Sequence, residues 1–343
     1  MIPILNRNYF MYNGRILENN GSSYLGFTNS SVEFYVKGYD DKNLIITADI
    51  STNLNDEVNE ARLKIFIDNC DTPSSIIVLN KEKSDYIVAS FDDDDIHKIT
   101  IVKITEAAMS YAKFNEINIL GGDLLALPDI EDERLKVEFI GDSITCGYGV
   151  HGLPNSPYHI KEEDGLYSYA HLTAKALNLN ARYFSVSGFG VFTKYDGDRN
   201  GIISKVYPYT NYFIDETITF DPKEFTPDLY VINLGTNDSG HIHNLEVANG
   251  FVNNYIELLL TLKKYSPDAK ILCTCGTLCN NVFSYIIEAV NKAKKIGLTN
   301  IHLLEFPYHN VIEDGIASGH PSFKTHEKDS ILLISKIKEI MNI

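Results

Sequence analysis

The sequence predicts two domains of different fold class. Residues 1–128 are expected to form an all-β domain of the jelly-roll or β-sandwich type, and residues 129–343 a three-layer α/β domain with a parallel sheet. The chain has 343 residues, more than the roughly 150 that one domain usually has. Short segments of alternating apolar and polar residues recur in the first part. Apolar segments that alternate with helical patterns follow in the second.

The alternating segments of the first part predict an antiparallel sandwich. They are rich in Val, Ile, Phe and Tyr, and turn residues separate them, which is typical of strands with one face in the core. The predicted strands cover residues 31–37, 43–48, 62–68, 75–79 and 97–105. The passage from Gly121-Gly122 through Pro128 to the acidic residues 129–134 is interpreted as the inter-domain linker.

The second part predicts a parallel sheet with helices on both faces, because its apolar strands alternate with helical segments. The predicted strands cover residues 136–140, 181–186, 229–234, 269–274 and 301–304, and helical patterns cover residues 168–177 and 252–264. Ligands of such sheets bind at the carboxyl ends of the strands. Residues that follow these strands are therefore the candidates for a functional site.

The composition excludes several partners. The net charge is −16, and phosphate groups are bound by clustered Lys and Arg, so we expect neither nucleic acid nor an anionic membrane as a partner. No segment has the roughly 20 apolar residues of a membrane span. The apolar stretch within residues 1–8 is too short for a signal peptide. We therefore expect a cytoplasmic protein, or a secreted one if a leader has been removed.

Two features that suggest metal ions have simpler interpretations. The acidic run Asp92–Asp95 lacks the spaced ligands of a calcium loop, which favours a solvated turn. Cys273 and Cys275 alternate along an apolar run and, together with Cys279, lack the spaced pairs of a zinc site, which favours structural cysteines. We expect no metal and no cofactor.

Residues 137–149 (VEFIGDSITCGYG) place a serine, Ser143, directly after an apolar strand. A serine at the sharp exit of a buried strand, with a helix beginning beyond it, exposes its hydroxyl beside free backbone N–H groups. An ordinary β-turn, in which Asp142 and Ser143 cap backbone donors, explains the same residues. The segment alone leaves a nucleophile and a turn open.

Candidate donors for a developing oxyanion follow the next two strands. Gly188 and Gly190 come after the second strand, and Asn237 comes after the third. A glycine lets its N–H approach a substrate closely, and the Asn amide offers an NH₂ donor, so with the Ser143 N–H they could form an oxyanion hole. A strand-end turn and an Asx-turn are the alternatives for Gly188 and Asn237.

The candidate base is His320, which lies in a Gly-Pro loop late in the chain. A neutral imidazole in such a loop, just before the helical stretch from Lys324 onward, could take the proton of Ser143. His326 falls in that helix and is expected to pack or cap. His241 and His243 are interpreted as loop residues.

These segments together resemble the SGNH (GDSL-like) hydrolases, whose four motif blocks are matched in order at residues 141–144, Gly188, residues 235–238 and His320-Pro321. Residues 141–149 and 320–326 resemble carbohydrate esterase family 2, whose members carry a jelly-roll domain ahead of the hydrolase. The resemblance implies a serine esterase that removes acetyl groups from xylan-type or glucomannan-type sugars. Ser143 would be the nucleophile and His320 the base. The Ser143 N–H, Gly188 and Asn237 would form the oxyanion hole, with Gly190 as the alternative glycine.

The sequence departs from the SGNH pattern at Ala317, because that family usually has Asp three residues before the His. An acceptor on the His Nδ1–H fixes the tautomer and stabilises imidazolium. A backbone carbonyl within residues 316–318 is favoured for this part, and Asp314 or Glu313 is the candidate orienting acid. The expected site is therefore a Ser-His dyad.

Two other functions remain open at this stage. A lipase or thioesterase would use the same residues on longer acyl chains. A carbohydrate-binding protein with a degenerate site would need an aromatic platform, and the chain offers 21 Tyr and 17 Phe but no Trp for it. The partner that we expect is an acetylated carbohydrate, and the oligomeric state is not predicted.

Overall fold

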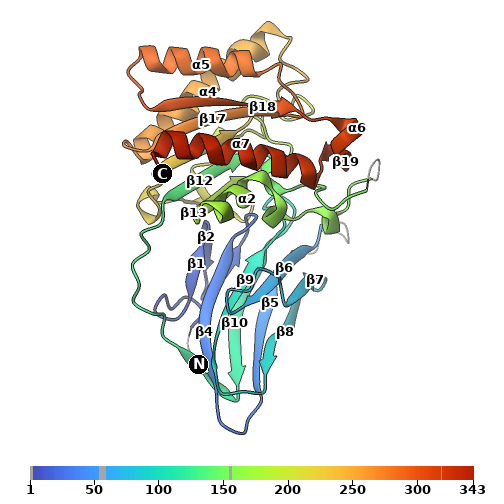
Figure 1. Cartoon of the computed structure of the whole chain (residues 1–343), viewed down its shortest axis with the longest axis vertical. Helices are drawn as coiled ribbons and strands as arrows, with labels where there is room; N and C mark the ends of the chain where they lie inside the picture. Colours follow the sequence, from blue (N-terminus) through green and yellow to red (C-terminus); the bar gives the residue numbers. More distant parts are fainter. Residues whose placement is uncertain (1–2, 54–58, 154–156, 318) are drawn as a thin grey trace. The chain divides into compact units, whose positions relative to one another are not determined.

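The computed structural model describes residues 3–53, 59–153, 157–317 and 319–343. The chain divides into two compact units, Met1–Asp132 and Glu133–Ile343 (Figure 1). The first unit consists of antiparallel sheets and the second of a parallel sheet with helices. The two fold classes predicted from the sequence are thus confirmed.

The first unit is a sandwich of two antiparallel sheets. One sheet has the order β1-β4-β9-β6-β7, and β11 also pairs with β4. Its strands are β1 (Met11–Asn13), β4 (Ser31–Gly38), β6 (Ala61–Ile67), β7 (Ser75–Leu79), β9 (Ile96–Lys103) and β11 (Gly122–Leu125). The other sheet has the order β2-β3-β10-β5-β8. Its strands are β2 (Ile16–Asn19), β3 (Ser22–Leu25), β5 (Leu44–Ser51), β8 (Lys83–Phe91) and β10 (Ala112–Leu120).

The core of this unit follows from the period of two. In β4, Val32, Phe34 and Val36 are fully buried and the residues between them are not. In β5 of the other sheet, Leu44 and Ile46 alternate in the same way, and all five belong to one apolar cluster. Successive side chains of a strand point to opposite faces, so each sheet contributes one face to a shared core.

The segment predicted as a linker is in part a strand. Gly121 makes a turn with φ of 74°, and β11 then pairs antiparallel with β4. A side chain at Gly121 would meet the carbonyl oxygen of Asn43, which explains the glycine. The sequence prediction was wrong here because a Gly-Gly pair marks a tight turn as readily as the start of a linker.

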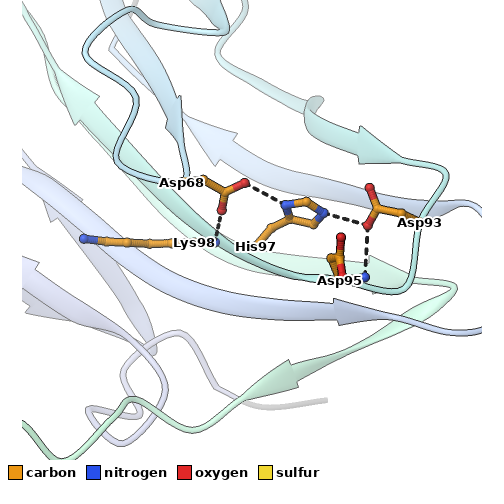
Figure 2. Close-up of polar contacts among 5 residues, drawn as sticks. All are labelled: Asp68, Asp93, Asp95, His97 and Lys98. Carbon is orange, nitrogen blue, oxygen red and sulfur yellow. Dashed lines mark hydrogen bonds and ion pairs between the residues drawn. The ribbon is translucent and has the colours of Figure 1, made fainter.

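The acidic run lies in the turn between β8 and β9, next to His97 of β9 (Figure 2). The Nδ1 of His97 is 2.8 Å from Asp68 Oδ2, and its Nε2 is 2.9 Å from Asp93 Oδ1. The ring stacks on Phe91, with 3.7 Å between the centroids. Burial alone would lower the pKa of His97, but the hydrogen bonds and charges of the two carboxylates outweigh it and raise the pKa. His97 therefore joins two turns as a cation.

The second unit is built on a parallel sheet of order β13-β12-β16-β17-β18. The strands are β12 (Lys136–Gly141), β13 (Asn180–Ser185), β16 (Leu229–Asn233), β17 (Lys270–Thr277) and β18 (Ile301–Tyr308). The order changes direction between β12 and β16, so the carboxyl ends of these strands and of β13 adjoin one another. Ligands of open α/β sheets bind at such a point.

Helices cover both faces of this sheet (Figure 1). Val231 and Leu272 pack with residues of α2 (Tyr169–Ala176) and α7 (Phe323–Met341). Tyr230 points the other way and donates a hydrogen bond to Ser266, which caps α4 (Leu245–Tyr265). One more long helix, α5 (Phe283–Lys295), packs beside α4.

Helix α4 begins seven residues before the predicted start at residue 252, with Asn244 as its N-cap. The helical pattern was weak there because Gly250 interrupts it. A side chain at Gly250 would run into the ring of Phe192, so this glycine lets the loop after β13 lie directly on the helix.

The remaining elements of the second unit are short. They are α1 (Ser143–Cys146), α3 (Ile203–Val206), α6 (Val311–Asp314), β14 (Tyr209–Asn211), β15 (Asp215–Thr219), β19 (Ile316–Ala317) and β20 (His320–Pro321), with the 3-10 turns Ile160–Glu162, Gly165–Tyr167 and Pro222–Glu224. Within the described part of the chain, no helix combines the length and the apolar character that a membrane crossing needs.

Candidate active site

Ser143 is the first residue of α1 and follows β12 with only Asp142 outside both elements. Asp142 accepts a hydrogen bond from the N–H of Ile144 at 3.0 Å and so caps the turn. A side chain at Gly141 would meet Thr145 Oγ1, so only glycine allows this sharp exit from the strand. The turn presents Ser143 at the carboxyl end of β12.

His320 lies beside this serine. Its Nε2 is 2.8 Å from Ser143 Oγ, although 177 positions separate the two residues in the chain. The short pairing of β19 with β20 fixes the backbone at His320, and α7 begins three residues later. The distance is that of a hydrogen bond, so the imidazole can accept the serine proton directly.

The Asn237 side chain comes from the loop after β16. Its Nδ2 donates a hydrogen bond to Phe189 O at 2.8 Å and lies 3.4 Å from Asp142 Oδ2. It therefore links the loop after β13 with the turn that carries Ser143. The structure thus brings together the carboxyl ends of the three strands from which the sequence predicted oxyanion donors.

Gly188 and Gly190 have different environments. Gly190 donates its N–H to Gly201 O, and a side chain there would meet the carbonyl oxygen of Thr193. Gly188 has φ of 77°, and among the described residues no acceptor takes its N–H. The geometry favours Gly188 as the free donor and gives Gly190 a structural part.

Asp238 fixes the loop that follows Gly188, and the sequence analysis had assigned it no part. Its carboxylate accepts hydrogen bonds from the N–H groups of Val191, Phe192 and Thr193 at 2.8–2.9 Å. Burial raises its pKa to about 6, against the effect of these three bonds. Asp238 stands next to Asn237 in the sequence, but the N–H groups that bind its carboxylate lie about 46 positions away, so no local pattern predicts these bonds.

Burial also raises the pKa of Asp142 to about 7. The carboxyl lies directly beside Ser143 in the chain and is fully buried. Its negative charge is therefore weakened close to the place where an oxyanion would form, which favours a second negative charge there.

Comparison with known proteins adds the family. The sequence profile described as "Carbohydrate esterase 2 N-terminal" matches residues 12–128, and that of the "GDSL-like Lipase/Acylhydrolase family" matches residues 139–300. The cellulase/esterase CelE of Acetivibrio thermocellus is 33% identical over 251 residues, 71% of this chain but 30% of CelE. The chain thus spans less than a third of the length of that relative.

A solved structure matches both units. The family two carbohydrate esterase from Clostridium thermocellum, in complex with cellohexaose, is 29% identical, with a TM-score of 0.85 over 97% of this chain and 99% of that one. The chain belongs to the family 2 carbohydrate esterases. An acetylxylan esterase / glucomannan deacetylase of Cellvibrio japonicus is 21% identical over 91% of this chain and 86% of that relative.

In this family 2 carbohydrate esterase, Asp314 has a partner other than the predicted one. Both of its carboxylate oxygens accept from Lys328 Nζ, at 2.7 and 2.8 Å. Its carbonyl oxygen accepts from Ser322 Oγ at 2.6 Å. Asp314 thereby ties α6 to α7. The favoured backbone acceptors of residues 316–318 include Ser318, which lies outside the described residues.

Two polar groups of α7 brace the esterase fold behind His320. His326 is fully buried, and its Nδ1 accepts the N–H of Tyr169 at the start of α2 at 3.1 Å, so it caps that helix as expected. Burial lowers its pKa to about 3, which keeps it neutral. Asp329 accepts a hydrogen bond from Thr277 Oγ1 at 2.6 Å, and burial raises its pKa to about 7.

The other residues singled out in the sequence lie around the site. Cys273 and Cys275 are buried on β17, whereas Cys279 is half-buried in the following loop, where a hydrogen bond with Cys275 lowers its pKa to about 7. His241 is in a turn, with Nε2 at 3.1 Å from Tyr195 O. Among residues 3–53, 59–153, 157–317 and 319–343, no three His, Cys, Asp or Glu side chains gather as metal ligands would.

Proposed function

We propose that this protein is a serine esterase that removes acetyl groups from acetylated sugars by means of Ser143 and His320. The observation that carries the proposal is the 2.8 Å contact between His320 Nε2 and Ser143 Oγ. A serine hydroxyl is a weak nucleophile unless an adjacent base takes its proton. The contact supplies such a base at the strand end where ligands of α/β sheets bind.

The first half of the reaction makes an acyl-enzyme. Ser143 Oγ attacks the acetyl carbonyl carbon while its proton passes to His320 Nε2. The carbonyl oxygen becomes an anion, which the N–H groups of Ser143 and Gly188 and the Asn237 amide stabilise. The tetrahedral intermediate collapses, the bond to the sugar oxygen breaks, and His320 returns the proton to that oxygen.

The second half releases acetate. Water enters beside His320, which removes a proton as the water oxygen attacks the acetyl-serine carbonyl. The same donors stabilise the second oxyanion. Collapse breaks the bond to Ser143 Oγ, which takes the proton back from His320, and the enzyme returns to its starting state.

The substrate class is supported by the relatives and by charge. The relatives are named as a cellulase/esterase and as acetylxylan esterases / glucomannan deacetylases, and one similar structure was determined with cellohexaose. The net charge of −16 favours a neutral glycan over an anionic ligand. An acetylated xylan-type or glucomannan-type oligosaccharide meets both conditions.

The test is acetate release from a panel of acetylated mono- and oligosaccharides by the wild type and by Ser143→Ala. We expect release by the wild type and none above the buffer blank by Ser143→Ala, with unchanged circular dichroism. Activity that survives in Ser143→Ala would refute the mechanism. Faster hydrolysis of octanoyl than of acetyl esters would instead indicate a lipase, and binding of the sugars by the wild type without acetate release would indicate a binding protein.

A further inference from the structure

The turn after Ser143 carries a tyrosine whose position is closely fixed. Tyr148 lies between Gly147 and Gly149, which have φ of 76° and 70°. Its N–H donates a hydrogen bond to Ser143 O at 3.0 Å. A side chain at Gly147 would meet the carbonyl oxygen of Asp164, so the backbone of the turn also packs closely against the chain at Asp164. Tyr148 is thus fixed to the same turn as the candidate nucleophile.

The ring of Tyr148 lies between two other rings. The His320 imidazole is 4.2 Å from it between centroids, at 37°, and the Tyr158 ring is 3.8 Å away at 11°. One face of a ring accommodates only one neighbour at such distances, so His320 and Tyr158 occupy opposite faces. The phenol of Tyr158 donates to Glu163 Oε2 at 3.0 Å, and Glu163 is fully buried. The stack is therefore anchored at its far end.

We propose that Tyr148, backed by Tyr158, is a positioning residue of His320: its ring face holds the imidazole against Ser143 and favours the imidazolium that forms on proton transfer. This inference rests on the proposed function. A ring face within about 6 Å of a cation attracts it through the ring quadrupole. The imidazolium is the state that exists while the oxyanion does, so the ring acts mainly on the transition state.

The stack of Tyr148 on His320 can compensate for the acid that this sequence lacks at position 317. Where SGNH enzymes usually have an acid to stabilise the imidazolium, this chain has Ala317. An aromatic face contributes to the same end from the side of the ring, and this contribution does not depend on which group accepts from Nδ1. It also restricts the rotation of the imidazole, which keeps Nε2 within reach of Oγ.

The titratable groups among the described residues that lie at His320 or on the helices next to it in the chain can be named. Ser143 of α1 contacts its Nε2, and Tyr148 covers one ring face. On α7, burial lowers the pKa of His326 and keeps it neutral. Asp314 of α6 is neutralised by Lys328. Tyr148→Leu and Tyr148→Phe leave the other groups unchanged, so a difference in the pKa of His320 between the two variants reports the ring of Tyr148.

The test compares Tyr148→Leu, which removes the ring, with Tyr148→Phe, which keeps it. For Tyr148→Leu we expect kcat for p-nitrophenyl acetate to fall about fivefold to tenfold, with KM within twofold. The acidic limb of kcat/KM should move down by about half a pH unit, because the protonated imidazole loses a favourable contact. Tyr148→Phe should restore both values. Tyr285→Leu, on α5, is the matched control and should behave like the wild type.

A second readout does not depend on hydrolysis. NMR titration of the His320 imidazole should give a pKa about half a unit lower in Tyr148→Leu than in Tyr148→Phe. Tyr158→Leu, which leaves Tyr148 in place, should show a smaller shift in the same direction and serves if Tyr148→Leu does not fold. Equal kcat and equal pKa in the Leu and Phe variants would overturn the inference. Failure of the proposed function shows separately, as activity that survives Ser143→Ala.

Discussion

His97 in the β-sandwich unit and His320 in the α/β unit both lie on an aromatic ring, but their nitrogens meet different partners. Both nitrogens of His97 are hydrogen-bonded to carboxylates, which requires both to be donors (Figure 2). The Nε2 of His320 meets the hydroxyl of Ser143. Two acids stabilise the cationic form of the first histidine and raise its pKa, whereas a hydroxyl leaves the second able to accept a proton. The partners, and not the residue type, distinguish a histidine that joins two turns from one that can act as the proposed base.

Acidic residues of the two units differ in the same sense. Asp68 and Asp93 are about half exposed and carry their charge at the surface. Asp142, Asp238 and Asp329 are buried, and burial raises the pKa of each. The sandwich unit thus uses charges as exposed contacts between turns. These three acids of the α/β unit are buried, and their raised pKa values leave them partly protonated near neutral pH.

The largest effect should come from exchanging the two histidines for the same residue. His320→Gln should lower kcat for p-nitrophenyl acetate by about 10³-fold or more, because the base is lost. His97→Gln should leave kcat within twofold, since His97 belongs to the other unit's turns. Steady-state kinetics on both variants measure this, and similar losses in the two would invalidate the distinction between the histidines.

A smaller effect is expected at the oxyanion donors. Asn237→Ala should reduce kcat by about 10²–10³-fold with little change in KM, because the amide acts on charge that develops in the transition state. Asn281→Ala is the matched control, because Asn281 also donates its amide to a loop carbonyl, at 3.0 Å from Ser239 O. If both variants lost activity equally, Asn237 would be a loop support and not an oxyanion donor.

The smallest effect concerns stability against pH. The pKa of Asp329 is raised, so the folded state holds its proton more tightly than the unfolded state. The stability that this group contributes is therefore lost as pH rises from about 4 to about 7. Asp329→Asn keeps an acceptor for Thr277 and removes the titration. It should lose less stability over this range, by an amount of up to about 4 kcal/mol.

The raised pKa of His97 means that its contribution to the stability of the sandwich unit changes at higher pH than that of Asp329. The stability that it contributes is complete below its unfolded pKa of about 6.5 and is lost as pH rises through the folded value. His97→Gln should therefore flatten the stability of the sandwich unit above pH 6.5, by less than about 1 kcal/mol. Thermal unfolding of both variants at pH 4.5, 6.5 and 8.5 tests the two windows; a single window common to both would contradict the assignment.

The central strands of the parallel sheet could be predicted because they are buried almost throughout. Apolar runs at residues 136–140 and 229–234 became β12 and β16, and the rule for parallel sheets then placed Ser143 and Asn237 at one edge. Contacts that depend on the tertiary fold were beyond the sequence. Nothing local indicates that Asp238 binds the loop after Gly190, or that the ring of Tyr148 lies on His320.

A local sequence pattern cannot be assigned when it fits two different structures. Gly121-Gly122 fits both a tight turn between two strands and the start of a linker, and only the pairing of β11 with β4 decides between them. Asp314 precedes His320 in the sequence, yet the partner that its carboxylate meets is Lys328 of the following helix, α7. A charge finds its partner by distance in space, which sequence spacing predicts only within a helix or a hairpin.

The order of the site along the chain has a consequence for the newly made protein. Ser143 follows the first strand of the parallel sheet, and His320 comes after the last. All five strands must therefore be aligned before Oγ and Nε2 can meet. A partly folded chain carries Ser143 without His320 beside it. We therefore expect the proposed ester hydrolysis only once the unit has folded, so hydrolysis of a simple ester can report the progress of that folding.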